Sequence, residues 1–293
     1  MESATKLTCP APAKLNLFLH VVGRRSDGYH LLQTLFRFID LGDTLYFSLR
    51  EDGAIRRLNA VEGVAEEQDL CVRAARLLQS ETGCGLGVDI TVEKRIPMGG
   101  GLGGGSSDAA TTLIALNRLW SLGLSRERLM RIGLRLGADV PVFVFGENAF
   151  AEGVGEELQA YPLPEEWYVV LFPPVQVPTA QIFSHPELTR NTVSITMRAL
   201  AKGQHFVGGA VREQQLRNDL QPVVCGLYPE VARYLVWLGN FGNAMMTGSG
   251  ACVFAGFASR SQAEAVYQQL PHEMRGVVAQ GLARHPLHDW VSE

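Results

Sequence analysis

A run of glycines constrains this chain more than any other feature of its sequence. Residues 99–105 read GGGLGGG, six glycines in seven positions, and lead directly into a Ser-Ser-Asp segment. Glycine in ordered backbone loses more conformational entropy on folding than other residues do, which costs about 0.5–1 kcal/mol per position. An ordered run therefore needs a compensating interaction. We expect its backbone to approach a ligand closely, where a Cβ atom would collide.

The flanks of the run indicate what that ligand is. Residues 88–93 alternate apolar and polar side chains, which predicts a strand. Residues 109–120 place apolar side chains at helical spacing, with Ser106 or Ser107 as the N-cap and Asp108 in the first turn. The first turn of a helix presents unpaired N–H groups and a partial positive charge. A strand, a glycine loop and a helix in this order predict a phosphate cradle.

Three common phosphate-loop motifs and a flexible linker fit the run less well. A P-loop needs Lys-Ser or Lys-Thr after its last glycine, and here serine follows directly. The GxGxxG pattern is matched only because the run is so dense in glycine, and residues 126–136 predict a second helix where a dinucleotide fold needs a strand. A protein-kinase loop requires valine where Ser107 stands. A linker would lack the flanking strand and helix.

Composition narrows the class of protein. The 293 residues are 46% hydrophobic and 19% charged, enough for one large or two medium domains. The net charge of −4 argues against a nucleic-acid-binding protein, so a polyphosphate would be held by backbone N–H groups, a few lysines and a metal ion. No apolar run is long enough to span a membrane, and no secretory signal is visible. Five scattered cysteines suggest free thiols in the cytoplasm.

The pattern along the chain predicts an α+β fold in two halves. Prolines at 162 and 164 mark a boundary, which gives domains at 1–160 and 161–293. In the first half we expect strands at Ala13–Val22, Leu31–Asp40 and Thr44–Arg50, a helix at Asp69–Gln79 and a short strand at Val140–Phe145. In the second half, strands are expected at Trp167–Phe172 and Gly276–Ala283, helices at Tyr228–Leu238 and Ser261–Gln269, and a second glycine turn within Met245–Phe257.

The string PMGGGLGGGSSDAA, residues 97–110, resembles the central motif of the GHMP kinases, a superfamily of small-molecule kinases. The resemblance implies a two-domain fold with ATP and the substrate in a cleft between the domains, and Mg²⁺ as the accompanying ion. No cage of metal ligands can be read from the sequence, as expected of an ion bound through substrate phosphates. The residues that the resemblance places at ATP are Lys94, Pro97, Met98, Gly99, Gly100, Gly101, Leu102, Gly103, Gly104, Gly105, Ser106, Ser107 and Asp108.

Two charged residues match the catalytic positions of this superfamily. Asp139 lies in the segment GADVP, and from local sequence it is either a helix cap or a functional acid. Lys14 lies in PAKLNL, within an alternating strand, where a solvated surface lysine is the ordinary outcome. The resemblance implies that Asp139 takes the proton of the acceptor hydroxyl, while Lys14 orients it and stabilises the transferring phosphoryl group.

A different set of residues determines the acceptor. The segment RSDGYH, which ends in Tyr29 and His30, resembles one branch of the superfamily, the kinases of a diphosphocytidyl-methylerythritol. The resemblance implies that Tyr29 and Phe183 sandwich a cytosine ring, that His30 hydrogen-bonds its edge, and that Thr179 lies in the same site. Asn16 would contact the methylerythritol part. Without the resemblance, the two aromatic residues would be read as core side chains.

The resemblance therefore predicts ATP-dependent phosphorylation of the 2-hydroxyl of 4-diphosphocytidyl-2-C-methyl-D-erythritol, a step of the non-mevalonate (methylerythritol phosphate) isoprenoid pathway. Another small-molecule GHMP kinase, of the homoserine or mevalonate type, is the alternative. A non-catalytic nucleotide sensor and a dinucleotide-dependent oxidoreductase are rivals from other classes. We expect a cytoplasmic monomer or weak homodimer that binds neither nucleic acid nor membrane. Residues 191–214 carry no recognisable motif.

Overall fold

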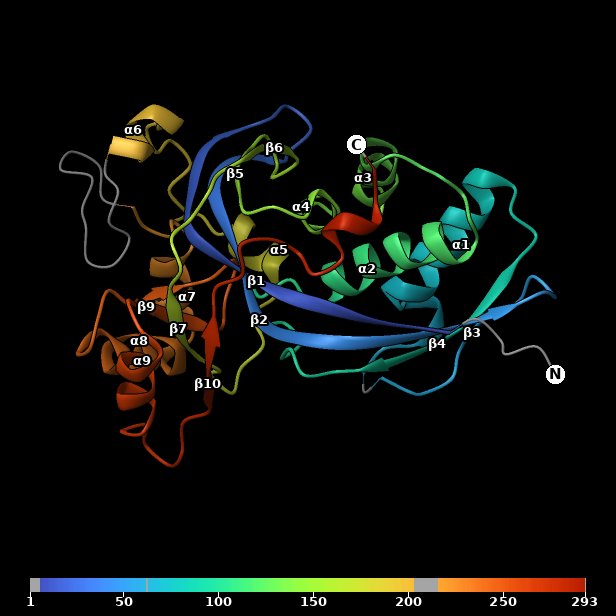
Figure 1. Ribbon diagram of the computed structural model, residues 1–293. Helices are drawn as coiled ribbons and strands as arrows, with labels where there is room; N and C mark the ends of the chain where they lie inside the picture. Colours follow the sequence, from blue (N-terminus) through green and yellow to red (C-terminus); the bar gives the residue numbers. More distant parts are fainter. Residues whose placement is uncertain (1–5, 62, 203–215, 293) are drawn as a thin grey trace.

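The computed structural model describes residues 6–61, 63–202 and 216–292, which form two α+β halves side by side (Figure 1). The elements of the first half are β1 (Lys6–Arg24), β2 (His30–Arg50), β3 (Ile55–Arg57), η1 (Glu66–Gln68), α1 (Leu70–Thr82), β4 (Gly87–Glu93), α2 (Gly104–Leu119), α3 (Arg126–Leu134), α4 (Val140–Phe145), β5 (Ala149–Glu152) and β6 (Glu157–Ala160). Those that follow are β7 (Trp167–Leu171), α5 (Thr179–Ser184), α6 (Met197–Lys202), α7 (Gln221–Leu227), α8 (Pro229–Gly239), β8 (Met245–Met246), β9 (Val253–Phe257), α9 (Arg260–Tyr267), β10 (Gly276–Gln280) and η2 (His288–Trp290).

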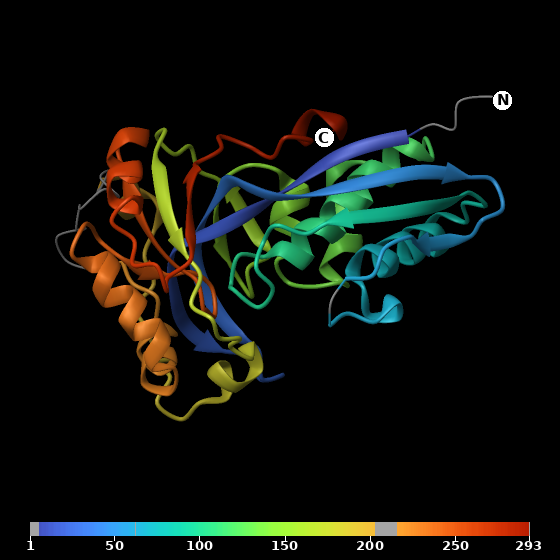
Figure 2. The ribbon, with the colours of Figure 1, turned by 90° about the horizontal axis from the view of Figure 1, so that it is seen from below.

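The first half is built on a long antiparallel ribbon. Strands β1 and β2 pair from Lys6 opposite Ser48 to Arg24 opposite His30. Strands β3 and β4 extend the sheet beyond β2 at one end, and β5 and β6 extend it at the other. Helices α1 and α2 lie over one face of the sheet (Figures 1 and 2). Their apolar side chains and those of the strands form the first hydrophobic core.

The second half is a smaller sheet with strand order β10-β7-β9-β8. Helices α8 and α9 pack on its outer side (Figure 2). A third apolar cluster joins the two halves, because Leu15 and Phe18 of β1 pack with Tyr168, Val170 and Phe254 of the second sheet. The chain then returns to the first half, where Leu282 N–H donates to the carbonyl of Phe38 over 2.8 Å.

Much of the predicted architecture is confirmed. The fold is α+β with two domains, residues 88–93 form β4, and the helix predicted at 69–79 is α1. Asp69 is the N-cap of α1, and its carboxylate accepts from the backbone N–H groups of Cys71 and Val72. The boundary between 160 and 161 stays a prediction.

One predicted break between strands and one predicted strand are wrong. The strands predicted at 31–40 and 44–50 are both confirmed, but they are parts of one continuous strand, β2, which pairs with β1 on either side of a register shift between Pro12 and Ala13. Residues 140–145 form helix α4 instead of a strand. A short apolar run does not distinguish the two structures by periodicity. Here Pro141 in the first turn and Gly146 in the left-handed region at the C-cap define a helix.

The predicted N-cap of α2 is also wrong. The helix begins at Gly104, three residues earlier than a cap at Ser106 requires, and its N-cap is Gly103 with φ of 74°. A glycine at this position adopts the left-handed backbone without strain. Ser106 and Ser107 therefore lie within the first turn of α2, where their side chains are available for other contacts.

Candidate active site

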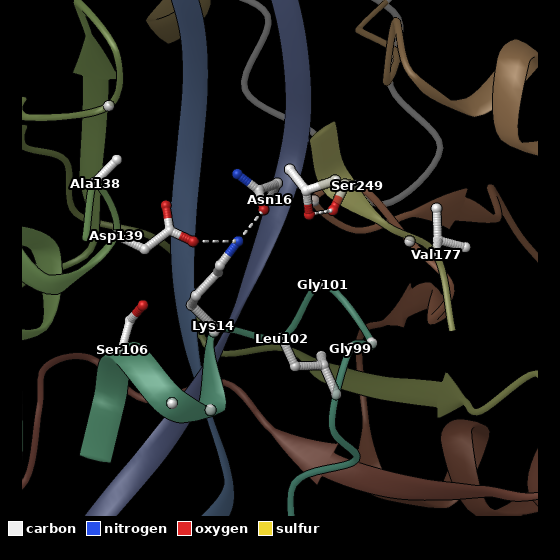
Figure 3. Close-up of a pocket in the computed structure, with 18 of the residues that line it drawn as sticks. Lys14, Asn16, Gly99, Gly101, Leu102, Ser106, Ala138, Asp139, Val177 and Ser249 are labelled. Carbon is white, nitrogen blue, oxygen red and sulfur yellow. Dashed lines mark hydrogen bonds and ion pairs between the residues drawn. The ribbon is translucent and has the colours of Figure 1, made fainter. Parts of the chain in front are cut away.

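A cavity of about 1010 Å³ lies where the two halves meet. Its wall includes the glycine loop and the start of α2 from the first half, and residues 177–184 and 248–250 from the second. Figure 3 shows Lys14 and Asp139 on one side of this cavity, the loop from Gly99 to Leu102 below, and Val177 and Ser249 opposite. A ligand in the cavity therefore contacts both halves.

The glycine loop is bound to both halves through its backbone. The N–H of Lys14 in β1 donates to the carbonyl of Leu102 over 3.0 Å. The N–H of Cys252, beside β9, donates to the carbonyl of Gly100 over 3.1 Å. The side chain of Leu102 is buried in the apolar cluster that joins the halves. The loop is thus a fixed wall of the cavity.

Steric contacts explain why glycine is required within the loop. At Gly101, with φ of 76°, a Cβ would lie 2.2 Å from the carbonyl oxygen of Thr247. At Gly103 it would lie 2.9 Å from the Phe143 ring and 3.1 Å from the Lys14 side chain. At these two positions the atoms that exclude a side chain belong to the protein, and the expected close approach of the loop to a ligand stays a prediction.

The two serines at the start of α2 face in different directions. The Ser107 hydroxyl is fully buried and donates to the carbonyl of Pro12 over 2.7 Å, which ties α2 to β1. Ser106 projects into the cavity on the side of Asp139 (Figure 3). All the predicted nucleotide-binding residues except Ser107 line the cavity. Ser106, at the positive end of α2, has a hydroxyl available to a phosphate.

Lys14 and Asp139 meet across the cavity. Lys14 extends from β1, is only 3% exposed, and places Nζ 3.3 Å from Oδ2 of Asp139 at the start of α4. Nζ also donates to Oδ1 of Asn16 over 2.5 Å and lies over the ring of Phe36. Asp139 is 37% exposed and makes no capping hydrogen bond to α4. Its carboxylate is thus oriented by Lys14 and open to a ligand.

Lys94 lies in a second cluster of charges beneath the loop. Nζ donates to Oδ2 of Asp108 over 2.6 Å and also to Asp43. Asp43 is fully buried and accepts from the backbone N–H groups of Arg95 and Ile96. The ammonium of Lys94 is therefore already paired, and the cluster holds the chain that leads into the loop.

Burial perturbs the acids and bases of this cluster. Burial raises the pKa of Asp108 to about 7, Lys94 opposes the rise, and the neighbouring Asp43 carboxylate adds to it. Burial alone would lower the pKa of Lys94, but the two carboxylates together raise it. Oδ1 of Asp108 is buried without a hydrogen-bond partner among the described residues.

The residues predicted to hold a base lie together at another part of the cavity wall. Tyr29 is 64% exposed, in the turn between β1 and β2. The rings of His30 and Phe183 lie 5.1 Å apart, and Phe183 belongs to α5. Thr179, at the start of α5, shares a hydrogen bond of 2.7 Å with Ser249. The exposure of Tyr29 shows that it is not a core aromatic residue.

Asn16 lies between Lys14 and the second half of the chain. Its backbone N–H donates to Oγ1 of Thr247 over 2.9 Å, and its Nδ2 donates to Thr34 over 2.9 Å. With Oδ1 bound to Lys14, Asn16 is fixed as the partner that orients the lysine. Sequence reasoning missed Thr247 and Asp43, although Thr247 begins the second glycine turn and so carried a local signal.

Models of two protein domains match the chain. The GHMP kinases N terminal domain matches residues 69–147, and the GHMP kinases C terminal domain matches residues 204–276. The crystal structure of a homoserine kinase from Cytophaga hutchinsonii shares the fold, with a TM-score of 0.71 at 15% identity over 97% of each chain. The fold and the glycine-loop site thus define a GHMP kinase.

Relatives of higher sequence identity indicate one branch of this superfamily. The 4-diphosphocytidyl-2-C-methyl-D-erythritol kinase of Thiobacillus denitrificans is 62% identical over 97% of this chain and 98% of its own length. That of Nitrosospira multiformis is 59% identical over 100% of this chain and 97% of its own. A crystal structure of 4-(cytidine 5'-diphospho)-2C-methyl-D-erythritol kinase superposes with a TM-score of 0.78 at 33% identity, covering 94% of this chain and 99% of the other. The chain belongs to the 4-diphosphocytidyl-2-C-methyl-D-erythritol kinase family.

Proposed function

We propose that this protein transfers the γ-phosphoryl group of ATP to the 2-hydroxyl of 4-diphosphocytidyl-2-C-methyl-D-erythritol. One observation carries the proposal. A single cavity is lined by the glycine loop, by the Lys14–Asp139 pair and by the aromatic cluster of Tyr29, His30 and Phe183. A phosphate cradle, a general base and a surface for stacking a base are the three parts that this reaction needs.

In the proposed reaction the carboxylate of Asp139 accepts the proton of the acceptor hydroxyl as its oxygen attacks the γ-phosphorus. The bond from that phosphorus to the β–γ bridging oxygen breaks, and ADP leaves with the electron pair. Lys14 stabilises the charge on the transferring group, as do the N–H groups at the start of α2. Because phosphoryl transfer depends mainly on positioning, the fixed loop and the oriented carboxylate are the protein's main contribution.

We infer that Mg²⁺ accompanies the nucleotide. Among the described residues no group of three or more His, Cys, Asp or Glu side chains could hold a metal ion. Mg²⁺ commonly keeps several waters and binds through substrate phosphates, and the Ser106 hydroxyl, which faces the cavity, fits as an oxygen donor of the protein. When bound, the ion would neutralise the charge of the phosphates.

The five cysteines are free thiols, which supports a reducing compartment such as the cytoplasm. No helix within the described ranges is long and apolar enough to cross a membrane. The expectation of a monomer or weak homodimer stays a prediction, to be tested by sedimentation velocity.

A panel of acceptors tests the proposed function. ADP release is measured with ATP and Mg²⁺ in the presence of the cytidyl substrate, mevalonate, homoserine or galactose. We expect turnover with the cytidyl substrate alone. Turnover with only homoserine or mevalonate would favour the alternative GHMP kinases, and the absence of ADP release with every acceptor would favour a nucleotide sensor.

A further inference from the structure

Arg190 lies behind the part of the cavity where the base is proposed to bind. It is half-buried and is not part of the cavity wall. Its guanidinium group donates four hydrogen bonds. Nε donates to Nε2 of His30 over 3.1 Å, Nη1 to the carbonyl of Leu188 over 3.0 Å, and Nη2 to the carbonyls of Phe183 and His185 over 3.0 and 2.7 Å. One side chain therefore contacts two of the three residues of the aromatic cluster.

The bond to His30 fixes where the imidazole proton lies. A guanidinium group has only donors, and a neutral imidazole has one donor and one acceptor nitrogen. Since Arg190 donates to Nε2, that nitrogen is the acceptor and Nδ1 carries the proton. A doubly protonated His30 would place two cations 3.1 Å apart with donor facing donor. His30 is therefore neutral, and the nitrogen it can offer to a ligand is a donor.

The bonds to the carbonyls hold the backbone at Phe183. Phe183 lies at the C-terminal end of α5, where helical carbonyl groups lack partners within the helix. Arg190 supplies donors to the carbonyls of Phe183 and His185 there, an arrangement favoured by its charge at a helix C-terminus. The backbone that carries Phe183 is thereby held, and its ring lies beside that of His30 at a centroid distance of 5.1 Å.

We propose that Arg190 is a positioning residue for base recognition. It fixes His30 as a neutral Nδ1–H donor and fixes Phe183 as the adjoining aromatic surface, so that the site selects a pyrimidine with a hydrogen-bond acceptor on its edge. The inference rests on the proposed function, because it assigns a role to a residue outside the cavity in binding the cytidine group.

The electrostatic surroundings of His30 agree with this role. Burial lowers the pKa of His30, and the positive charges of Arg190 and Arg24 lower it further. These two arginines are the charged groups that act on His30, and both favour the neutral imidazole. The neutral form is the one that the bond from Arg190 requires.

Substitution of Arg190 tests the inference by kinetics. We expect Arg190→Met to raise KM for the cytidyl substrate about tenfold or more, with kcat at saturation and KM for ATP within about threefold of wild type. Arg190→Lys retains the charge without the planar fork, so its KM stays at least about threefold above wild type. Arg260→Met, which removes an exposed arginine on α9, serves as the matched control and leaves all three parameters unchanged.

Two further readouts separate positioning from a general loss of structure. Removal of Arg190 removes one influence that lowers the pKa of His30, so the acid limb of kcat/KM moves to higher pH in Arg190→Met. In the His30→Ala background, the same substitution has less than half its effect on log KM, because the two residues act as a pair. Nitrogen NMR of wild type is expected to show His30 protonated on Nδ1.

The inference is overturned if Arg190→Met leaves KM for the cytidyl substrate unchanged, if it raises KM for ATP equally, or if lysine restores wild-type KM. A proton on Nε2 of His30 also overturns it. Failure of the proposed function gives a different result, since wild-type protein would then not turn over the cytidyl substrate at all. The Tm of every variant is measured, and kinetic parameters are compared only between variants whose Tm is close to that of wild type.

Discussion

Lys14 and Lys94 both reach the wall of the same cavity, yet their surroundings differ. The Nζ of Lys14 meets one carboxylate, that of Asp139, which is 37% exposed to the cavity. The Nζ of Lys94 meets two, Asp43 and Asp108, which are 0% and 7% exposed. Lys14 is held by the uncharged oxygen of Asn16, whereas Lys94 is enclosed between opposite charges.

These different surroundings show which ion pair is available for chemistry. A carboxylate open to the cavity can accept a proton from a substrate, and a lysine that pairs with a single carboxylate can also stabilise a phosphoryl group. Carboxylates that are buried and bound to backbone N–H groups contribute to holding the chain in place. We therefore propose that the Lys14 pair acts in catalysis and that the Lys94 cluster supports the loop.

Exchanging each lysine for methionine gives the largest contrast. Lys14→Met is expected to lower kcat by about a thousandfold and to change Tm little, because the exposed Asp139 remains solvated. Lys94→Met leaves two buried carboxylates unpaired and is expected to lower the free energy of unfolding by about 3 kcal/mol, with kcat within about tenfold of wild type. Steady-state kinetics and chemical denaturation measure the two effects. Equal losses of kcat in both variants would contradict the assignment.

Asp108→Asn tests the role of the Lys94 cluster through the pH dependence of stability. Folded protein holds the Asp108 proton up to a pKa of about 7, whereas the unfolded chain releases it near its ordinary value of 3.8. Between these values the folded state binds more protons, so the free energy of unfolding falls as pH rises through the window. Asparagine does not titrate, so Asp108→Asn does not lose this free energy of unfolding as the pH rises. The Tm of Asp108→Asn relative to that of wild type should therefore increase by about 2–6 °C between pH 5 and pH 8.

Thermal melts at several pH values check this prediction, with Asp52→Asn as the control. Asp52 is an exposed carboxylate just after the end of β2, paired with Arg50. The pair with Arg50 lowers the pKa of Asp52 to about 2. Ionised Asp52 therefore stabilises the fold above about pH 4, and this contribution is lost as the pH falls toward 2. Asp52→Asn should thus change the pH dependence of Tm only at low pH, and in the opposite direction to Asp108→Asn. A gap between Asp108→Asn and wild type that stays constant from pH 5 to pH 8 would refute the buried-acid assignment.

The smallest effect is expected at Asn16. Asn16→Ala removes the 2.5 Å hydrogen bond to Lys14 but leaves the ion pair with Asp139. We expect kcat to fall by about three- to tenfold, in line with the loss of one hydrogen bond to a charged group. Thr34→Val, which removes the partner of the Asn16 amide without touching Lys14, should have a smaller effect on kcat. A loss at Asn16 as large as that at Lys14 would show that the asparagine itself acts on the reacting groups.

Local sequence was sufficient to predict one part of the site. The strand, the glycine loop and the helix are consecutive, so the phosphate loop was predicted from local sequence alone. Lys14, Asp139 and Tyr29 were given their roles through the resemblance of their short motifs to a family. Their meeting in one cavity came from the resemblance to a family. The direction of Ser107 could not be predicted, because it depends on how α2 packs on β1.

Contacts between distant residues account for the rest. Asp43 binds a lysine 51 positions away, and Arg190 binds a histidine 160 positions away. Neither residue stands in a motif, and either would pass as a solvated surface charge. Helix α4 was mistaken for a strand because six apolar residues fit both structures, and tertiary packing decides between them.

The turnover of Asp139→Asn tests most directly whether the exposed pair is the catalytic one. Asparagine keeps the size of the side chain and loses its ability to accept a proton. With ATP and the cytidyl substrate at saturation, kcat should fall by about a thousandfold, while KM for both substrates and Tm stay near wild type. A kcat within tenfold of wild type in the folded variant would contradict the assignment of Asp139 as the base.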